Sequence, residues 1–156
     1  MSHKIIKGKR ISAPIRLELK QRIAVLKERG WQPHLASIEI GSTPAASLYI
    51  RNQRRVCEKM GITFDNRKYP HDITQPEMLA AIHALNVDPR VTGMILQRPV
   101  PDHINVRSLQ SAIHPLKDVE GMNPASIGNI IYNEAALAPC TAAAHVKLVR
   151  QSVLNM

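Results

Sequence analysis

The segment at residues 91–97, VTGMILQ, most constrains the fold, because it is largely apolar and carries no charge. This pattern is typical of a strand in a sheet that is covered on both faces. Parallel sheets have that property, since their connections place helices over the faces. The segment therefore predicts a layered α/β domain built around a buried sheet.

Further strands and helices fit this arrangement. Strands are predicted at residues 34–40 (HLASIEI), from 62 to 64, and at an edge from 4 to 6. Apolar residues at three- to four-residue spacing predict helices from Ser12 to Gly30, from Thr74, from Val106 to Pro115 and from residue 139 onward. Thr74 and Glu77 form a capping box, and Thr141 is expected to cap the last helix.

The order of these elements is strand, helix, strand, helix, strand, helix. This order is typical of a mainly parallel sheet with right-handed crossovers. We therefore predict a three-layer α/β/α domain. Residues 127–131 form a further short apolar piece.

The stretch from Gly41 to Gly61 is expected to be a loop that opens a helix, with Ser42 and Ser47 as available caps. Tyr49, Gln53 and Cys57 recur every four residues, so they share one helix face. A phenol and an amide at the start of a buried stripe indicate a binding site. A core helix with its Tyr and Gln at the rim is the alternative.

Length and composition exclude several classes of protein. The 156 residues suit one domain, no apolar run is long enough to span a membrane, and the basic N-terminus lacks the apolar block of a signal peptide. The cysteines, Cys57 and Cys140, form no metal or redox motif and look like reduced thiols. We expect a cytoplasmic protein with no metal site.

The net charge of +9 allows a nucleic acid, a small polyanion or simply a solvated basic surface. Aromatic residues make up only 3% of the chain, so platforms for stacking the bases of single strands are scarce. We do not expect nucleic acid to be the main partner.

Ligands of parallel α/β sheets bind beyond the carboxyl ends of the strands. Here those ends lead into the loop at Gly41 and into the loop from Gln97 to Pro99. Two polar segments that are distant in sequence should therefore meet. We expect the side chains of Gln53 and Gln97 to lie within about 10 Å of each other, a span that one water or ligand bridges.

Four segments together resemble the bifunctional methylenetetrahydrofolate dehydrogenase/methenyltetrahydrofolate cyclohydrolase family. They are GSTPAASLYIRNQRRVCEKMGI, GMILQRPVP, HPLKDVEGMNP and APCT, in the order and spacing of that family. The resemblance covers nearly the whole chain. It implies the N-terminal catalytic domain of the family at residues 1–138, and a linker helix at 139–156.

The resemblance also implies site residues. Tyr49 stands where the family packs a tyrosine on the pterin ring, and Gln97 stands where a glutamine holds the catalytic lysine and the one-carbon unit. These matches give Gln53 and Gln97 as catalytic positions. The implied substrate-binding residues are Tyr49, Leu96, Gln97, Arg98, Pro99 and Glu120.

The chain departs from the family at several of these positions. Gln53 replaces the lysine of cyclohydrolase chemistry, Arg98 replaces a leucine, Glu120 replaces the second aspartate of K-D-V-D-G, and Ala142 replaces a proline. Hydrolysis of the cationic methenyl group needs a proton carrier, and an amide cannot titrate near neutral pH. We expect weakened or lost cyclohydrolase activity. Compared with aspartate, Glu120 carries its carboxylate one methylene further from the backbone. The alternative to a ligand-binding role for Glu120 is a solvated carboxylate paired with Lys117.

The family continues into a nucleotide-binding domain that uses NADP or NAD, and this chain carries no glycine-rich turn for a dinucleotide. We therefore expect no cofactor within the chain, a tetrahydrofolate derivative as ligand, and a homodimer or partner chain over the surface left by the truncated domain. Three alternatives stay open: a fragment of a one-carbon enzyme, a non-catalytic folate-binding or regulatory protein, and a basic domain that binds nucleic acid.

Overall fold

The computed structural model describes residues 7–134 and 137–153, except for the side chains of residues 45, 152 and 153. Three strands form one sheet in the order β2-β1-β3: β1 (His34–Ile40), β2 (Thr63–Tyr69) and β3 (Gly93–Leu96). Both neighbours of β1 run parallel to it. The predicted parallel α/β fold is therefore confirmed.

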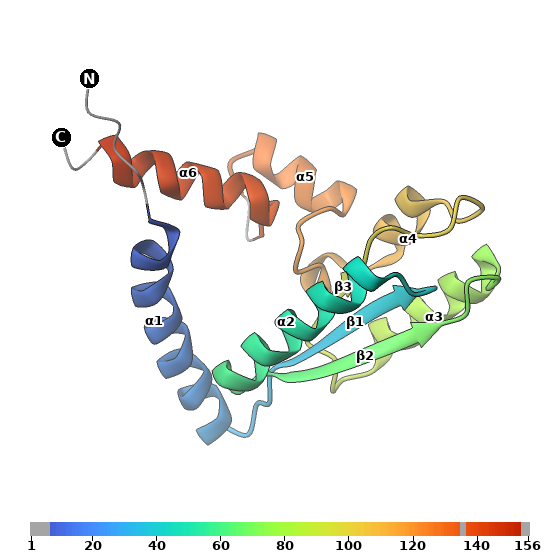
Figure 1. Cartoon of the computed structure of the whole chain (residues 1–156), viewed down its shortest axis with the longest axis horizontal. Coiled ribbons are helices and arrows are strands. Elements are labelled where there is room, and N and C mark those ends of the chain that lie inside the picture. The colour runs from blue at the N-terminus through green and yellow to red at the C-terminus, as the bar shows by residue number, and fades with distance from the viewer. Residues whose placement is uncertain (1–6, 135–136, 154–156) are drawn as a thin grey trace.

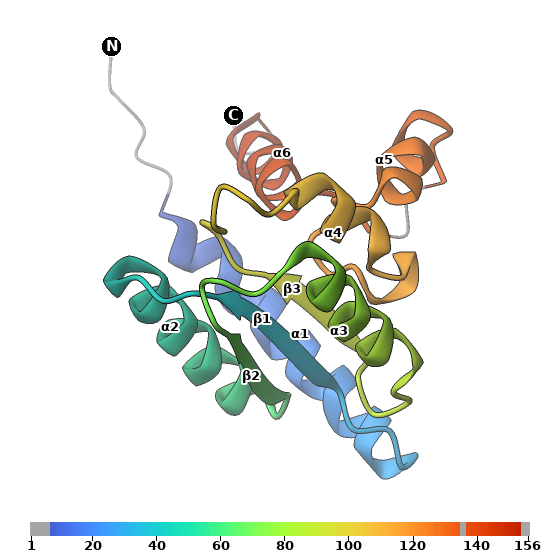
Figure 2. The same ribbon diagram turned by 90° about the vertical axis from the view of Figure 1, so that its right-hand side faces the viewer.

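Seven helical segments are connected to this sheet within the described ranges. They are α1 (Gly8–Glu28), α2 (Pro44–Met60), α3 (Gln75–Val87), α4 (Val106–Ala112), the 3-10 turn η1 (Pro115–Lys117), α5 (Pro124–Ile131) and α6 (Cys140–Val153). Helix α2 covers one face of the sheet, and α3 and α4 cover the other (Figure 2). The domain therefore has helices on both faces, as the uncharged third strand predicts.

Each face of the sheet has its own core. The larger cluster includes Ala36, Ile38 and Ile40 of β1 and packs under Met78 and Ile82 of α3. On the other face, Ile50 and Cys57 of α2 pack with Phe64 of β2. Alternate residues of β1 therefore point to opposite faces, as strand geometry requires. The odd-numbered positions of β1 face α2, where the candidate site lies.

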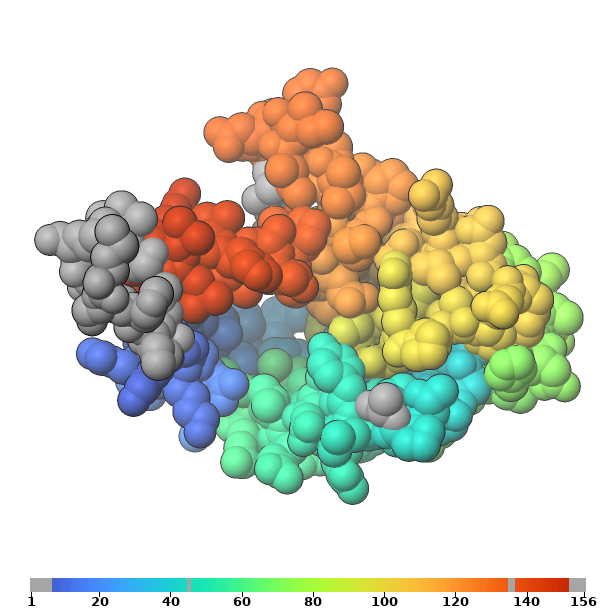
Figure 3. Space-filling view, turned by 45° about the horizontal axis from the view of Figure 1, so that its top comes forward, coloured from blue at the N-terminus to red at the C-terminus, as the bar shows by residue number. Residues whose placement is uncertain are grey.

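Helices α1 and α6 stand apart from this body (Figure 1), and a hollow opens between α1, α2 and α6 (Figure 3). Ile23 is the one buried residue within α1, although that helix is 21 residues long. On α6, Val146 and Val149 are 50% and 59% exposed. The apolar stripe predicted for the last helix is thus exposed to solvent as far as its side chains are described.

Several boundaries differ from the sequence prediction. Helix α1 begins at Gly8 rather than Ser12, β2 continues to Tyr69, and β3 is shorter than residues 91–97. Residues 127–131 belong to helix α5, whose N-cap is Asn123. Helix α6 begins at Cys140, so Thr141 lies within its first turn and was wrongly predicted as its cap. The strand predicted at residues 4–6 lies outside the described residues.

The helix starts show which local signals are reliable. The capping box at Thr74 is confirmed: its hydroxyl accepts from the Glu77 N–H, and the Glu77 carboxylate accepts from the Thr74 N–H. The prediction that Ser42 or Ser47 caps α2 is wrong. Thr43 is the N-cap, with its hydroxyl accepting from Ala46 N–H at 3.2 Å, because it directly precedes the proline of the first turn.

Candidate functional site

Helix α2 carries the first part of the site. Thr43 starts it and Gly61, with a φ of 80°, ends it. Cys57 is buried, Gln53 is half-buried, and Tyr49, one turn nearer the start of the helix, is 57% exposed. The face shared by these three residues therefore runs from the core to an open surface, as a wall of a binding site would.

Gln97 follows β3 directly and is 4% exposed. Its side-chain Nε2 donates to the Oε1 of Gln53 at 2.8 Å and to the hydroxyl of Ser37 at 2.9 Å. Its backbone N–H donates to the carbonyl of Ile38 at 2.8 Å. The prediction that Gln53 and Gln97 converge is confirmed by direct contact. The Gln97 amide therefore binds two side chains and does not merely satisfy the backbone of the loop.

The two neighbours of Gln97 face different surroundings. The side chain of Leu96 lies in the core cluster beneath α3. Leu96 can therefore contribute only backbone groups to the α2 face. Arg98 and Pro99 are exposed, and the peptide bond between them is cis. The loop after Gln97 thus leaves the buried sheet immediately and reaches the surface.

Glu120 lies in a loop that Asp118 organises from a buried position. The Asp118 carboxylate accepts the N–H of Glu120 at 3.2 Å and the N–H of Asn123 at 2.6 Å. Glu120 itself is half-buried, and burial raises the pKa of its carboxyl group, as does the charge of Asp118. Arg98 and the backbone of Leu96 oppose that rise in pKa. The neighbouring charges therefore act on the Glu120 pKa in opposite directions, with Asp118 raising it and Arg98 lowering it.

Lys117 does not pair with Glu120, contrary to one interpretation of the sequence. Its ammonium group donates to the backbone carbonyls of Leu85 and Asp88, at 3.0 and 2.8 Å. Cations at this position stabilise a helix, because the last carbonyls of a helix carry partial negative charge. Lys117 thus ties the loop to the end of α3.

Sequence reasoning missed three polar side chains on this face of the sheet. Ser37 and Glu39 of β1 are 0% and 2% exposed, and Asn66 of β2 donates to the Glu39 carboxylate at 2.7 Å. A signal for the first two exists in HLASIEI, where Ser37 and Glu39 stand two residues apart in a central strand. Polar residues at this spacing share one face of a strand.

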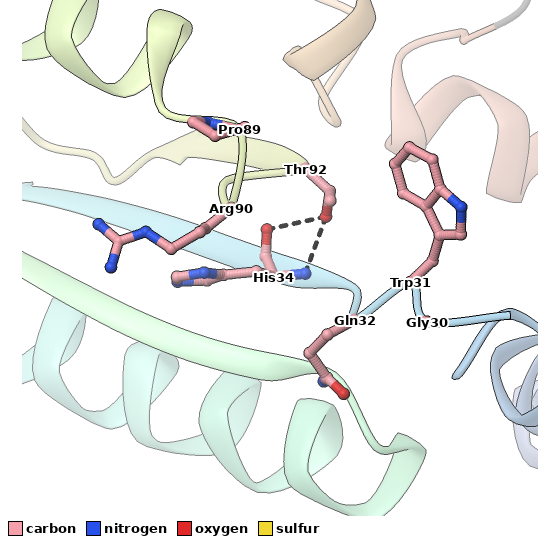
Figure 4. A pocket seen from close by; sticks show the side chains of 7 residues that line it. All are labelled: Gly30, Trp31, Gln32, His34, Pro89, Arg90 and Thr92. Carbon is pink, nitrogen blue, oxygen red and sulfur yellow. Dashed lines mark hydrogen bonds between the residues drawn. The ribbon is translucent and has the colours of Figure 1, made fainter. Parts of the chain in front are cut away.

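The structure also has a cavity of about 430 Å³ at the opposite end of the sheet. Figure 4 shows its lining around His34, at the start of β1, with Thr92 bonded to the His34 backbone and Trp31 pointing outward. It contains none of the predicted site residues. Because ligands of parallel sheets bind at the carboxyl ends of strands, we place the site at Gln53 and Gln97.

No group of three or more His, Cys, Asp or Glu side chains in residues 7–134 and 137–153 could hold a metal ion. No helix in these ranges is both long and apolar enough to cross a membrane. Cys57 is a buried free thiol, and Cys140 is an exposed one.

Residues 6–120 match the family model for the catalytic domain of tetrahydrofolate dehydrogenase/cyclohydrolase. The chain belongs to this family. It is 52% identical over 151 residues to bifunctional protein FolD 2 of Mesorhizobium japonicum, and 62% identical over 122 residues to bifunctional protein FolD 3 of Roseobacter denitrificans. These matches cover 97% and 78% of this chain, but 49% and 42% of the relatives.

Solved structures give the same result. The bifunctional FolD of Campylobacter jejuni superposes with a TM-score of 0.89 at 36% identity, over 93% of this chain and 52% of that one. The enzyme of Trypanosoma brucei, solved with NADP and an inhibitor, superposes with a TM-score of 0.89 at 29% identity, over 97% and 53%. The chain thus spans about half the length of these relatives. The family resemblance drawn from the four motifs is confirmed.

Proposed function

We propose that this chain is the tetrahydrofolate-site domain of a methylenetetrahydrofolate dehydrogenase/methenyltetrahydrofolate cyclohydrolase in which the cyclohydrolase step is weakened. One observation carries the proposal: the Gln97 amide donates at 2.8 Å to Gln53, the position at which the family pattern has its lysine. The position still belongs to the site, but its side chain cannot carry a proton.

The chemistry of hydrolysis explains the expected loss. Water attacks the cationic methenyl carbon, so a nearby group must take a proton from the water and deliver one to the departing nitrogen. Gln53 can orient a water or a carbonyl by hydrogen bonding, but its amide does not titrate near neutral pH. General acid–base catalysis is worth about 10²–10⁴-fold, and this is the range of the expected deficit.

The other residues keep binding roles in this proposal. The ring of Tyr49, exposed on the same face of α2, stacks on the pterin. The Glu120 carboxylate accepts from the pterin N–H groups, and Arg98 lies next to it or meets a folate carboxylate. Leu96 contributes backbone, and Pro99 shapes the exit of the loop. Hydride transfer needs a nicotinamide, which we propose is held by residues outside this chain.

The test is to restore the lysine. Gln53→Lys should speed methenyltetrahydrofolate hydrolysis at least about tenfold, within the range of acid–base catalysis. The assay follows the loss of methenyl absorbance, corrected for the spontaneous rate. Asn52→Lys is the matched control, because it adds the same charge to the neighbouring, exposed position of α2.

Two results would contradict the proposal. Equal rates for the wild type and Gln53→Lys, with folate bound by both, would favour a non-catalytic folate-binding protein. An equal increase in Asn52→Lys would show that added positive charge, rather than a proton carrier at position 53, accounts for the change.

A further inference from the structure

A buried carboxylate lies beside the candidate site, and the roles proposed above leave it unexplained. Glu39 occupies the central strand β1 and is 2% exposed. Its neighbours Ile38 and Ile40 belong to the cluster beneath α3. Because successive side chains of a strand alternate, Glu39 points to the face that α2 covers, as Ser37 does.

Strand pairing places Glu39 next to Gln97. Ile38 pairs with Leu96 in the parallel ladder, and the Gln97 N–H donates to the Ile38 carbonyl at 2.8 Å. Each of Glu39 and Gln97 follows its paired residue by one position, on strands about 4.8 Å apart. Since Gln97 contacts Gln53 and Ser37, Glu39 is part of the same polar floor.

The carboxylate of Glu39 is only partly neutralised. Its Oε2 accepts from the Asn66 amide at 2.7 Å, and the Lys68 ammonium lies 4.0 Å from the same oxygen on a side chain that is 68% exposed. The Oε1 of Glu39 and the Oδ1 of Asn66 are buried with no hydrogen-bond partner among the described residues. Two acceptor oxygens without donors create a negative potential at this floor.

Burying a charge is costly, so a buried carboxylate with an unpartnered oxygen requires a compensating role. Gln53, Gln97 and Ser37 are neutral, which makes Glu39 the source of formal charge among the side chains of this floor. A charge at a poorly solvated site acts on a ligand more strongly than the same charge in water.

We propose that Glu39 makes this site select a cationic folate, the methenyl form, over folates whose ring system is uncharged. The inference rests on the proposed function, since it requires that folate binds here. Asn66 holds the carboxylate in place by its hydrogen bond, and Lys68 moderates its field from the outer strand. Glu39 is thus a specificity-determining residue that acts through charge.

The experiment measures the dissociation constants of methenyltetrahydrofolate and tetrahydrofolate by calorimetric titration. The methenyl form is verified by its absorbance before and after each run. Both ligands carry the same glutamate carboxylates, so the ratio of the two constants isolates the charge on the ring system. Glu39→Gln should lower the preference for the methenyl form by about tenfold, because it removes a charge at short range.

Two further variants complete the test. Glu18→Gln is the matched control on α1, where the side chain is 69% exposed, and it should leave the preference unchanged. Lys68→Gln removes the cation near Glu39 and should raise the preference by about two- to threefold. Because the Lys68 side chain is largely exposed, this variant should fold even if Glu39→Gln does not.

The outcomes separate the two proposals. An unchanged ratio in Glu39→Gln, or in Lys68→Gln where Glu39→Gln does not fold, overturns the inference and leaves the proposed function standing. Equal weakening of both ligands in Glu39→Gln assigns Glu39 a structural role and also overturns the inference. If the wild type binds neither folate, the proposed function fails, and the inference fails with it.

Discussion

A single added methyl group should disturb the loop that carries Glu120 from beneath. Gly93 opens β3, and a Cβ built on it would lie 2.5 Å from Cγ1 of Val119 and 3.8 Å from Cδ1 of Leu35. Carbon atoms pack at about 3.5–4.0 Å, so Val119 would have to retreat by about 1 Å. Overpacking of this kind costs about 1–3 kcal/mol of the unfolding free energy. Gly93→Ala should therefore destabilise the protein by that amount.

The same change should weaken folate binding, because Val119 directly precedes Glu120. The Val119 N–H also donates to the carbonyl of Met94 at 3.4 Å, so the loop cannot move without loosening its bond to β3. Misplacement of a binding group by about 1 Å can cost up to about 10²-fold. Denaturant unfolding gives the stability, and calorimetric titration with tetrahydrofolate gives the binding constant.

A double-mutant cycle tests the physical cause. Val119→Ala removes the methyl group that blocks the new Cβ, so Gly93→Ala should cost less than about 1 kcal/mol in that background. Gly128→Ala is a matched control, because no atom lies within 4 Å of its added Cβ. Since Gly128 lies inside α5, its substitution should stabilise by up to about 1 kcal/mol. Additive costs at positions 93 and 119 would refute the steric explanation.

Two further predictions concern charge and surface. The pKa of Glu120 is raised above its ordinary value near 4.5, so in the window just above 4.5 the folded state binds more protons than the unfolded state, and stability falls as pH rises. Glu120→Gln should remove that fall. The free energy of unfolding of both proteins is measured from about pH 4 to about pH 8, and a constant difference between them over this range would contradict the raised pKa of Glu120. The exposed apolar stripe on α6 should drive self-association of the protein. Val146→Glu should reduce the molecular mass that light scattering measures. A wild type that stays monomeric at every concentration tested would contradict this prediction.

The sequence predicts the sheet well where local pattern and burial agree. Residues 34–40 form β1 as predicted, because this strand is central and its β-prone run is short and bounded. The sequence does not predict the end of β2, because TFDNRKY contains the run DNRK, four consecutive polar or charged residues, in an edge strand where burial leaves little trace in the sequence. Propensity alone does not distinguish such a strand from a loop.

The candidate site shows a similar division. The contact of Gln53 with Gln97 follows from helix spacing and parallel topology, both of which the sequence carries. The roles of Ser37 and Glu39 depend on which face of β1 lies under α2. That assignment needs the strand order, and the order is set by long-range packing. The sequence shows that the side chains of this strand alternate between two faces, but it does not show which face α2 covers.

The outer strands of the sheet limit how a second polypeptide can attach. An edge strand offers unpaired backbone groups, and proteins guard such edges with charge. The outer strand β2 carries Asp65, Arg67 and Lys68 in this role. At the other side, a parallel bridge from Met94 to Asp118 continues the pairing beyond β3. Extension of the sheet by a second chain is therefore disfavoured at both edges, and we expect any partner to dock through helices.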